Sequence, residues 1–187
     1  MGIIQSCPFC KSSCLNSLSL IIVECGCGWR LSLEDKQALS FYIGNKVEGL
    51  TLDEVWGYDA NTMEDKHDYI QWMFPNDEPS QFNPNAPLLS DEECRIFKAS
   101  PALLCCAINS VGKFMNFLRS NMHLWIQPFN HNHLRITRML KFLMLIGLET
   151  EAEARLEELR LISETYSETD LSVSMNYWTN ACDKRVR

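Results

Sequence analysis

Cysteines near the N-terminus are the residues whose type and spacing most clearly indicate chemistry. Cys7 and Cys10 are spaced as in the turns that direct two thiolates to one tetrahedral metal ion. Cys25 and Cys27 form a second pair, and the glycine after each of them permits the positive φ that such a turn requires. The pattern predicts one zinc ion bound by Cys7, Cys10, Cys25 and Cys27. Four thiolates leave no position for a catalytic water, so this zinc would be structural.

The spacing of the second pair leaves two alternatives open. A CxC pair is one residue shorter than the usual CxxC, so Cys14 could replace one of the four ligands. The thiols could also remain free in a small apolar hairpin without a metal. The alternating apolar residues Leu18, Leu20 and Ile22 predict a β-strand between the two pairs. We therefore expect residues 1–31 to form a small, zinc-ribbon-like β-hairpin.

The composition predicts a packed protein, because 46% of the residues are hydrophobic and 22% are charged. The net charge of −7 argues against non-specific nucleic-acid binding by the whole surface, although a local basic patch could still bind. An odd number of cysteines without a recognisable secretory signal indicates a reducing compartment, and we expect a cytoplasmic location. No apolar run approaches the roughly 20 residues of a membrane span, so none is predicted.

From residue 32 onward, apolar residues recur at helical spacing, which predicts one mainly α domain of about six helices over residues 32–187. The sequence from Ser90 to Glu93 is a capping box, and Ser100 before a proline is typical of a helix N-cap. A helix of about 18 residues should follow Ser100. Four prolines in residues 75–89 predict an extended loop at the surface.

A helix capped by Asn132 should carry an unusually basic face. Arg135 and Arg138 are three residues apart, and Lys141 follows at the same interval, so the three cations lie on one face. His131 and Asn132 lie at the start of this helix, where backbone N–H groups favour an anion. Two arginines one turn further along could hold a phosphate or a carboxylate. The face is therefore a candidate site for an anionic or peptide ligand.

The same cations could instead be neutralised within the chain. Glu78 could pair with Arg135, and the acidic stretch 149–170 could neutralise the rest of the basic face. Trp72 has the spacing of a core residue, but its position beside the proline-rich loop would also allow it to line a groove for a partner. No residue has a fixed relation to His67 that would complete a catalytic dyad or triad, so we do not expect an enzyme.

Two stretches of sequence resemble a known family. One reads HDYIQWMFP from His67 to Pro75, and the other reads NHNHLRITRML from Asn130 to Leu140. Through them, residues from about 56 to 180 are similar to the conserved N-terminal domain of the opioid growth factor receptor family. The resemblance implies an α-helical, non-enzymatic, receptor-like module that recognises a peptide or protein partner. The residues that we expect to contact this partner are Trp72, Glu78, His131, Asn132, Arg135 and Arg138.

A second hypothesis rests on the N-terminal segment, which is similar to the small zinc ribbons of bacterial and phage proteins. On this hypothesis the chain is a nucleic-acid-associated or phage-related regulatory factor. The segment carries Lys11 and Arg30 against Glu24, which is a weak electrostatic footprint for DNA. The receptor-like hypothesis is favoured because its two stretches are more specific and its similarity covers most of the chain.

We predict that the purified, reduced protein carries about one zinc ion per chain. Because the thiols must be deprotonated to bind, acidification should release the zinc, and chelation should unfold the N-terminal segment while the helices remain. Elemental analysis before and after acidification measures the zinc content. Freshly reduced protein without zinc would contradict the site, and zinc that persists in the Cys25→Ser, Cys27→Ser double variant would contradict the ligand set.

Overall fold

The computed structural model describes residues 15–16, 22–24, 30–33 and 35–183 of the chain. In this part the chain forms ten helices and three short strands, so the predicted mainly α class is confirmed. The proposed metal ligands Cys7, Cys10, Cys25 and Cys27, and the alternative ligand Cys14, lie outside the described residues. The zinc site therefore stays a prediction.

The strands form one small antiparallel sheet in the order β1 (Leu15–Asn16), β2 (Ile22–Glu24) and β3 (Arg30–Ser32). In the pairing of β2 with β3, Val23 lies opposite Leu31. The predicted hairpin is wrong in two respects. The sheet has three strands and not two, and β3 ends at Ser32, where the helical domain was expected to begin. Strands of two or three residues are too short to show a recognisable alternation of apolar side chains.

Four short helices come next: α1 (Gln37–Tyr42), α2 (Leu52–Trp56), α3 (Ala60–Asp65) and α4 (Tyr69–Met73). A capping box formed by Thr51 and Glu54 starts α2. Helices of five or six residues contain fewer than two turns, so their apolar residues cannot reveal a 3.6-residue period. This is why the prediction of about six helices is wrong for the part of the chain described here.

The next two helices, α5 (Asp91–Ala99) and α6 (Pro101–Ser120), begin at the predicted caps. Ser90 Oγ accepts a hydrogen bond from Glu93 N, and the Glu93 carboxylate accepts one from Ser90 N at 3.0 Å. Ser100 caps α6 in the same way, with proline at the first helical position. The local side-chain chemistry of these residues therefore sets both helix starts.

By length and composition alone, α6 is long and apolar enough to cross a membrane. The central helix of a globular domain meets the same criterion. One face of α6, which includes Val111, Phe114 and Leu118, is buried in the core of this structure. The composition of α6 is thus explained by its place in the helical domain.

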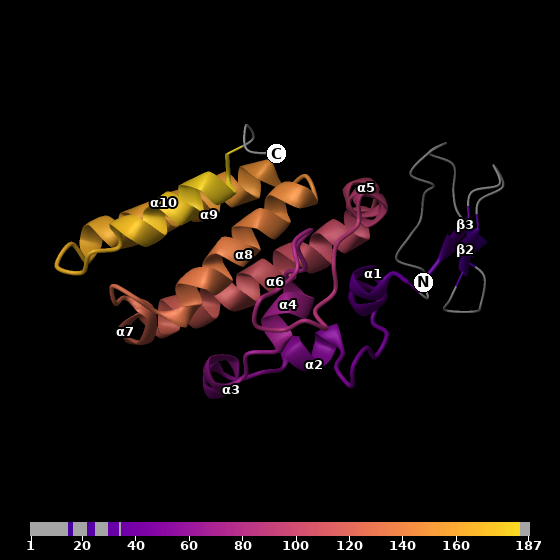
Figure 1. The fold of residues 1–187 in the computed structure, drawn as a ribbon, viewed down its shortest axis with the longest axis horizontal. Coiled ribbons are helices and arrows are strands. Elements are labelled where there is room, and N and C mark those ends of the chain that lie inside the picture. Colours follow the sequence, from indigo (N-terminus) through magenta and orange to yellow (C-terminus); the bar gives the residue numbers. More distant parts are fainter. Residues whose placement is uncertain (1–14, 17–21, 25–29, 34, 184–187) are drawn as a thin grey trace.

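The C-terminal half contains α7 (Met122–Trp125), α8 (His131–Leu145), α9 (Glu149–Thr165) and α10 (Ser172–Ala181). Figure 1 shows α8 between the α9–α10 pair on one side and α6 on the other. Hydrogen bonds from Arg135 and Arg138 of α8 to Met63 O and Phe74 O also connect α8 directly to α3 and to the end of α4. The N-cap of α8 is Asn130 and not Asn132 as predicted, because the Asn130 side chain accepts a hydrogen bond from the backbone of Asn132.

An aromatic cluster joins the short helices to α8. The Tyr42 ring lies 4.9 Å from the Phe97 ring and 5.7 Å from the Phe142 ring, and Phe74 lies 5.9 Å from Phe142. The Tyr42 hydroxyl donates a hydrogen bond to the carbonyl of Met73, so this buried tyrosine keeps its polar atom satisfied. The cluster fixes the end of α4, and thus the start of the loop that follows it, against α8.

His133 attaches α10 to α8. Its Nε2 lies 2.9 Å from the carbonyl of Trp125, its Nδ1 lies 2.8 Å from Ser174 Oγ, and its backbone carbonyl accepts a hydrogen bond from Trp178 Nε1. The two indole rings pack edge-on against the imidazole. In a neutral His133, Nε2 donates to the Trp125 carbonyl and Nδ1 accepts from Ser174. Burial lowers the pKa of His133, so this neutral form is favoured.

We expect the free energy of unfolding to decrease as the pH falls below about 6.5, the usual pKa of an unfolded histidine. The unfolded chain then binds a proton that the native His133 binds less readily, so acid favours unfolding, while above that pH the full stability is present. In His133→Gln the decrease between pH 7 and 5 should be smaller, and only the contribution of other groups such as His131 should remain. Urea unfolding at several pH values, with an NMR titration of the His133 ring, measures this. An unchanged slope in the variant would contradict the assignment.

Candidate functional site

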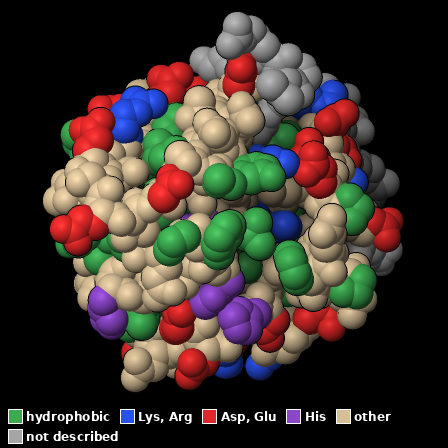
Figure 2. Space-filling view, turned by 60° about the vertical axis from the view of Figure 1, so that its left-hand side comes forward, with side chains coloured by type: hydrophobic (Ala, Val, Ile, Leu, Met, Phe, Trp, Pro, Cys, Tyr) green, Lys and Arg blue, Asp and Glu red, His purple; other side chains and the backbone are tan. Residues whose placement is uncertain are grey.

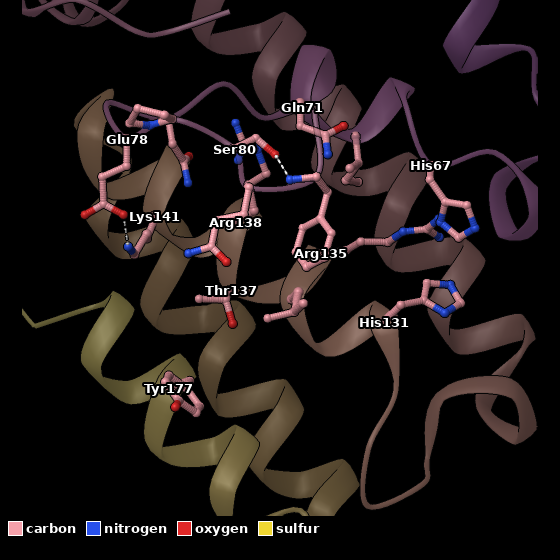
Figure 3. Close-up of a pocket in the computed structure, with 16 residues that line it drawn as sticks. His67, Gln71, Glu78, Ser80, His131, Arg135, Thr137, Arg138, Lys141 and Tyr177 are labelled. Atoms are coloured by element: carbon pink, nitrogen blue, oxygen red, sulfur yellow. Dashed lines mark hydrogen bonds and ion pairs between the residues drawn. The ribbon is translucent and has the colours of Figure 1, made fainter. Parts of the chain in front are cut away.

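An open groove of about 540 Å³ runs along α8. It is lined by residues of α8, of α4 and the turn before it, of the first half of the proline loop (residues 75–89), and by one residue of α10. Figure 3 shows His67 and His131 at one end, Glu78 and Lys141 at the other, Arg138 between them, and Tyr177 on the α10 side. Segments far apart in sequence therefore form a single site.

The helical repeat of α8 places its polar side chains in the groove. His131, Arg135, Arg138 and Lys141 follow one another at intervals of three or four residues and line it. The opposite face of α8 is apolar and buried in the core. Packing of the apolar face thus directs the basic face into the groove, as the sequence predicted.

Hydrogen bonds near both of its ends attach the proline loop to the rest of the structure. Leu89 N donates a hydrogen bond to the carbonyl of Asn76 at 2.9 Å. With its amide nitrogen toward α8, Asn76 also donates to the carbonyls of Pro75 and Arg138 at 3.1 and 3.3 Å. Between these attachments the loop carries Glu78 and Phe82 over the groove, and both side chains are largely exposed to solvent.

Arg135 is buried and holds α8 to the end of α3. Its Nη1 donates to Met63 O at 2.8 Å, and its Nη2 donates to Lys66 O at 2.8 Å and, more weakly, to Glu64 O at 3.4 Å. The carbonyls at the C-terminus of a helix have no partner within the helix, and they favour a cation. Arg135 therefore supplies the cap that the sequence of α3 does not provide itself.

Side chains complete the surroundings of Arg135. Asn132 Oδ1 accepts a hydrogen bond from Nη1, and His67 Nδ1 lies 3.0 Å from Nη2, where it must be the acceptor. Burial lowers the pKa of Arg135, and Tyr69 and Glu64 partly oppose this effect. Among the described residues, the hydrogen-bond acceptors of this guanidinium are carbonyl, amide and imidazole groups and not carboxylates.

The predicted pairing of Glu78 with Arg135 is therefore wrong. Glu78 pairs with Lys141 at 2.8 Å, one turn further along α8. In the acidic stretch, Glu158 pairs with Arg119 of α6 and with Arg155 of its own helix. The sequence placed Arg135 on the basic face of the helix but could not show that backbone carbonyls would be its acceptors.

Among the described residues, the guanidinium of Arg138 makes a single hydrogen bond, in contrast to that of Arg135. Its Nε donates to Phe74 O at 2.8 Å, whereas its buried Nη2 has no acceptor among the described residues. Burial lowers the pKa of Arg138 to about 10, and Glu78 opposes this fall. The group therefore stays charged at neutral pH. A buried donor without an acceptor costs about 1–3 kcal/mol, so an incoming oxygen atom that accepts from it would be stabilised.

Two histidines and a carboxylate form the other end of the groove. The His67 and His131 rings lie 5.1 Å apart, and His131 Nε2 lies 3.4 Å from Glu64 Oε1. Asn132 donates to the second oxygen of Glu64 at 3.0 Å, which fixes the carboxylate. Burial and the charge of Arg135 lower the pKa of His131, and Glu64 offsets them only in part. Across the described ranges, no three metal-binding side chains are grouped to hold an ion.

The rim of the groove is apolar and exposed. Phe82 is 79% exposed, Leu134 is 58% exposed and Tyr177 is 64% exposed, whereas most large apolar side chains of the domain are buried. Figure 2 shows this face, where hydrophobic side chains surround a hollow that contains Lys and Arg side chains, with histidines beside it. An exposed apolar rim around a polar centre is typical of a surface that meets a partner.

The structure brings together most of the predicted site residues but not all of them. Glu78, His131, Arg135 and Arg138 line the groove, and buried Asn132 supports it from behind. The predicted contact through Trp72 is wrong, because this side chain is 4% exposed and packs against the Phe41 ring at 5.8 Å. Trp72 lies on the side of α4 that faces the core, whereas the neighbouring Ile70 and Gln71 line the groove.

Sequence reasoning missed the apolar rim. Leu134 fits the apolar period of α8, so its spacing is that of a core residue, and Phe82 lies in a loop without periodicity. Tyr177 lies between Met175, which is partly buried against the core, and the buried Trp178, so only the contact between α10 and α8 shows that it faces the groove. A single aromatic residue in an otherwise polar loop was the one available signal, at Phe82.

These features define the chain, in its described part, as a mainly α domain with a basic groove and an apolar rim. Residues 32–123 match the family model described as the opioid growth factor receptor conserved region. The match contains the His67 and proline-loop side of the groove and ends before α8. No solved structure matches the chain.

The curated relatives that match this chain carry the name of the same family. The human opioid growth factor receptor is 31% identical over 142 residues, which cover 62% of this chain and 20% of that protein. Mouse opioid growth factor receptor-like protein 1 is 31% identical over 140 residues, which cover 62% of this chain and 30% of that protein. The family model and these relatives together show that this region of the chain is similar to the opioid growth factor receptor conserved region. The aligned region spans less than a third of either relative.

We expect Arg135→Ala to lower the free energy of unfolding by about 3 kcal/mol or more, because it leaves the end of α3 without its hydrogen-bond donor. Arg135→Lys should lose much of the same stability, since an ammonium group cannot reproduce the planar arrangement of donors. Arg160→Ala is the matched control. Arg160 is half exposed and pairs only with Glu157 in the described residues, so its loss should cost about 0.5 kcal/mol or less. Urea unfolding measures all three, and equal stability of the two alanine variants would contradict the role of Arg135.

Proposed function

We propose that this domain is a receptor-like module that binds a peptide or protein segment in the groove along α8. The observation that carries the proposal is the combination of an exposed apolar rim with the incompletely bonded guanidinium of Arg138 at its centre. Binding sites for peptides commonly combine a few apolar anchors with a small number of fixed polar groups. The relatives are named as receptors, which agrees with a binding role rather than with catalysis.

The geometry of the groove favours an extended ligand. The groove is open, and its polar groups are spread from His67 and His131 at one end to Glu78 and Lys141 at the other. A ligand that reached both ends would contact α4, the proline loop, α8 and α10 together. Its apolar side chains could cover Leu134 and Tyr177, which now face solvent.

The architecture gives less support to the nucleic-acid hypothesis. The two cations Arg138 and Lys141, at the centre and at one end of the groove, are accompanied by the carboxylate of Glu78. Tracking a phosphate backbone requires several cations in a row, and the chain as a whole carries a net charge of −7. A peptide or protein ligand needs no such stripe.

We expect a displayed peptide library to yield ligands whose binding depends on the rim. Leu134→Glu combined with Tyr177→Glu should weaken the selected peptides at least tenfold, because it removes two apolar anchors that are already exposed and so changes folding little. Leu161→Glu, at an exposed leucine of α9 outside the groove, is the control and should change binding less than twofold. Fluorescence anisotropy measures the affinities. Peptides that bind the rim variant as well as the unmodified protein would contradict the proposal.

A further inference from the structure

We propose that the ligand of this groove presents a carboxylate, from an aspartate, a glutamate or a C-terminus, to Arg138 and Lys141. The inference rests on the proposed function, and it specifies the chemistry of the peptide that the groove receives. In this proposal Arg138 determines the specificity for a carboxylate. The carboxylate of Glu78 occupies part of the position that the ligand carboxylate would take. The domain is thus a receptor for an acidic peptide.

The hydrogen bonding of Arg138 is the first argument. Arg135, one turn earlier, has acceptors on both terminal nitrogens. Arg138 uses Nε alone, toward Phe74 O, and its buried Nη2 has no acceptor among the described residues. A guanidinium that is fixed at Nε and incomplete at its other nitrogens is prepared to donate to an oxygen anion, and carboxylates accept from it in a fixed geometry.

The local charge is the second argument. Among the described residues that line this part of the groove, Arg138 and Lys141 contribute two positive charges and Glu78 contributes one negative charge, which leaves an excess of one positive charge. A carboxylate carries a single negative charge and would neutralise it. A phosphate group at neutral pH carries up to about two and would leave an excess of negative charge beside Glu78. The balance therefore favours a carboxylate over a phosphorylated side chain.

The position of Glu78 is the third argument. Its carboxylate lies 2.8 Å from Lys141 Nζ, and its charge also acts on Arg138. Its side chain is 68% exposed and comes from the proline loop, so it can leave this pairing without disturbing the core. Glu78 thus marks the place where a carboxylate is stable, and a carboxylate of the ligand would compete with it.

The apolar rim is the fourth argument, because it restricts the anion to one carried by a larger molecule. Leu134 and Tyr177 flank the same stretch of α8 as Arg138 and remain exposed in the free domain. A free carboxylate ion would cover neither side chain. A peptide with an apolar residue close to its acidic group would cover both and place the carboxylate at Arg138.

The test measures peptides selected on the full-length protein, together with copies in which each Asp or Glu is replaced by Asn or Gln and any C-terminal carboxylate is amidated. Neutralising the contacting carboxylate should weaken binding roughly tenfold to 100-fold, as should Arg138→Gln. Glu78→Gln should strengthen binding about two- to fivefold, because it removes the competing and repelling charge. Glu164→Gln, which removes one negative charge from an exposed site on α9 outside the groove, should leave affinity unchanged.

The outcomes separate this inference from the proposed function. Rim-dependent peptides whose binding needs no carboxylate, or that bind more weakly to Glu78→Gln, would overturn the carboxylate ligand and leave the binding groove intact. Phosphorylated peptides that bind more tightly than their Asp and Glu counterparts would overturn the choice of carboxylate. If no selected peptide depends on the rim, both proposals fail. Circular dichroism and thermal melting of Arg138→Gln separate a loss of folding from a loss of binding.

Discussion

The structure of the groove depends on one buried cation, the Arg135 guanidinium, and on the backbone carbonyls that surround it. Removing a charge from water is costly, and here three carbonyls at the end of α3, with an amide and an imidazole, replace the lost hydration. The contact joins segments about 70 residues apart in the chain. It sets the position of α8 relative to α3 and the turn that carries His67, and so forms one end of the groove.

The difference between two arginines on the same face of α8 explains how one helix can both support and form a site. Arg135 has acceptors for both terminal nitrogens, so it contributes to stability and has little left to offer a ligand. Arg138 lies one turn further on, where α4 has ended, and Phe74 O is the single acceptor that the described residues provide. Because the two have the same type and the same helical face, only their neighbours in the fold give them different roles.

The parts of this structure that sequence could predict are those that local chemistry determines. The caps Ser90 and Ser100 placed the starts of α5 and α6 correctly, and the 3.6-residue period placed the basic face of α8 opposite its buried face. Contacts between distant segments were beyond reach. The pairing of Glu78 with Lys141 and the position of Tyr177 each depend on how helices pack, and helices of four to six residues were too short to be recognised.

The central claim is that Arg135 is occupied by the fold while Arg138 is available to a ligand. NMR of the arginine side-chain N–H groups, recorded while an acidic peptide selected on this protein is added, tests it most directly. The account predicts that the Nη signals of Arg138 shift and become protected from exchange with water as the peptide binds, whereas those of Arg135 are protected before addition and change little. Arg135 signals that respond in place of Arg138, or Arg138 signals that do not respond to a bound peptide, would contradict it.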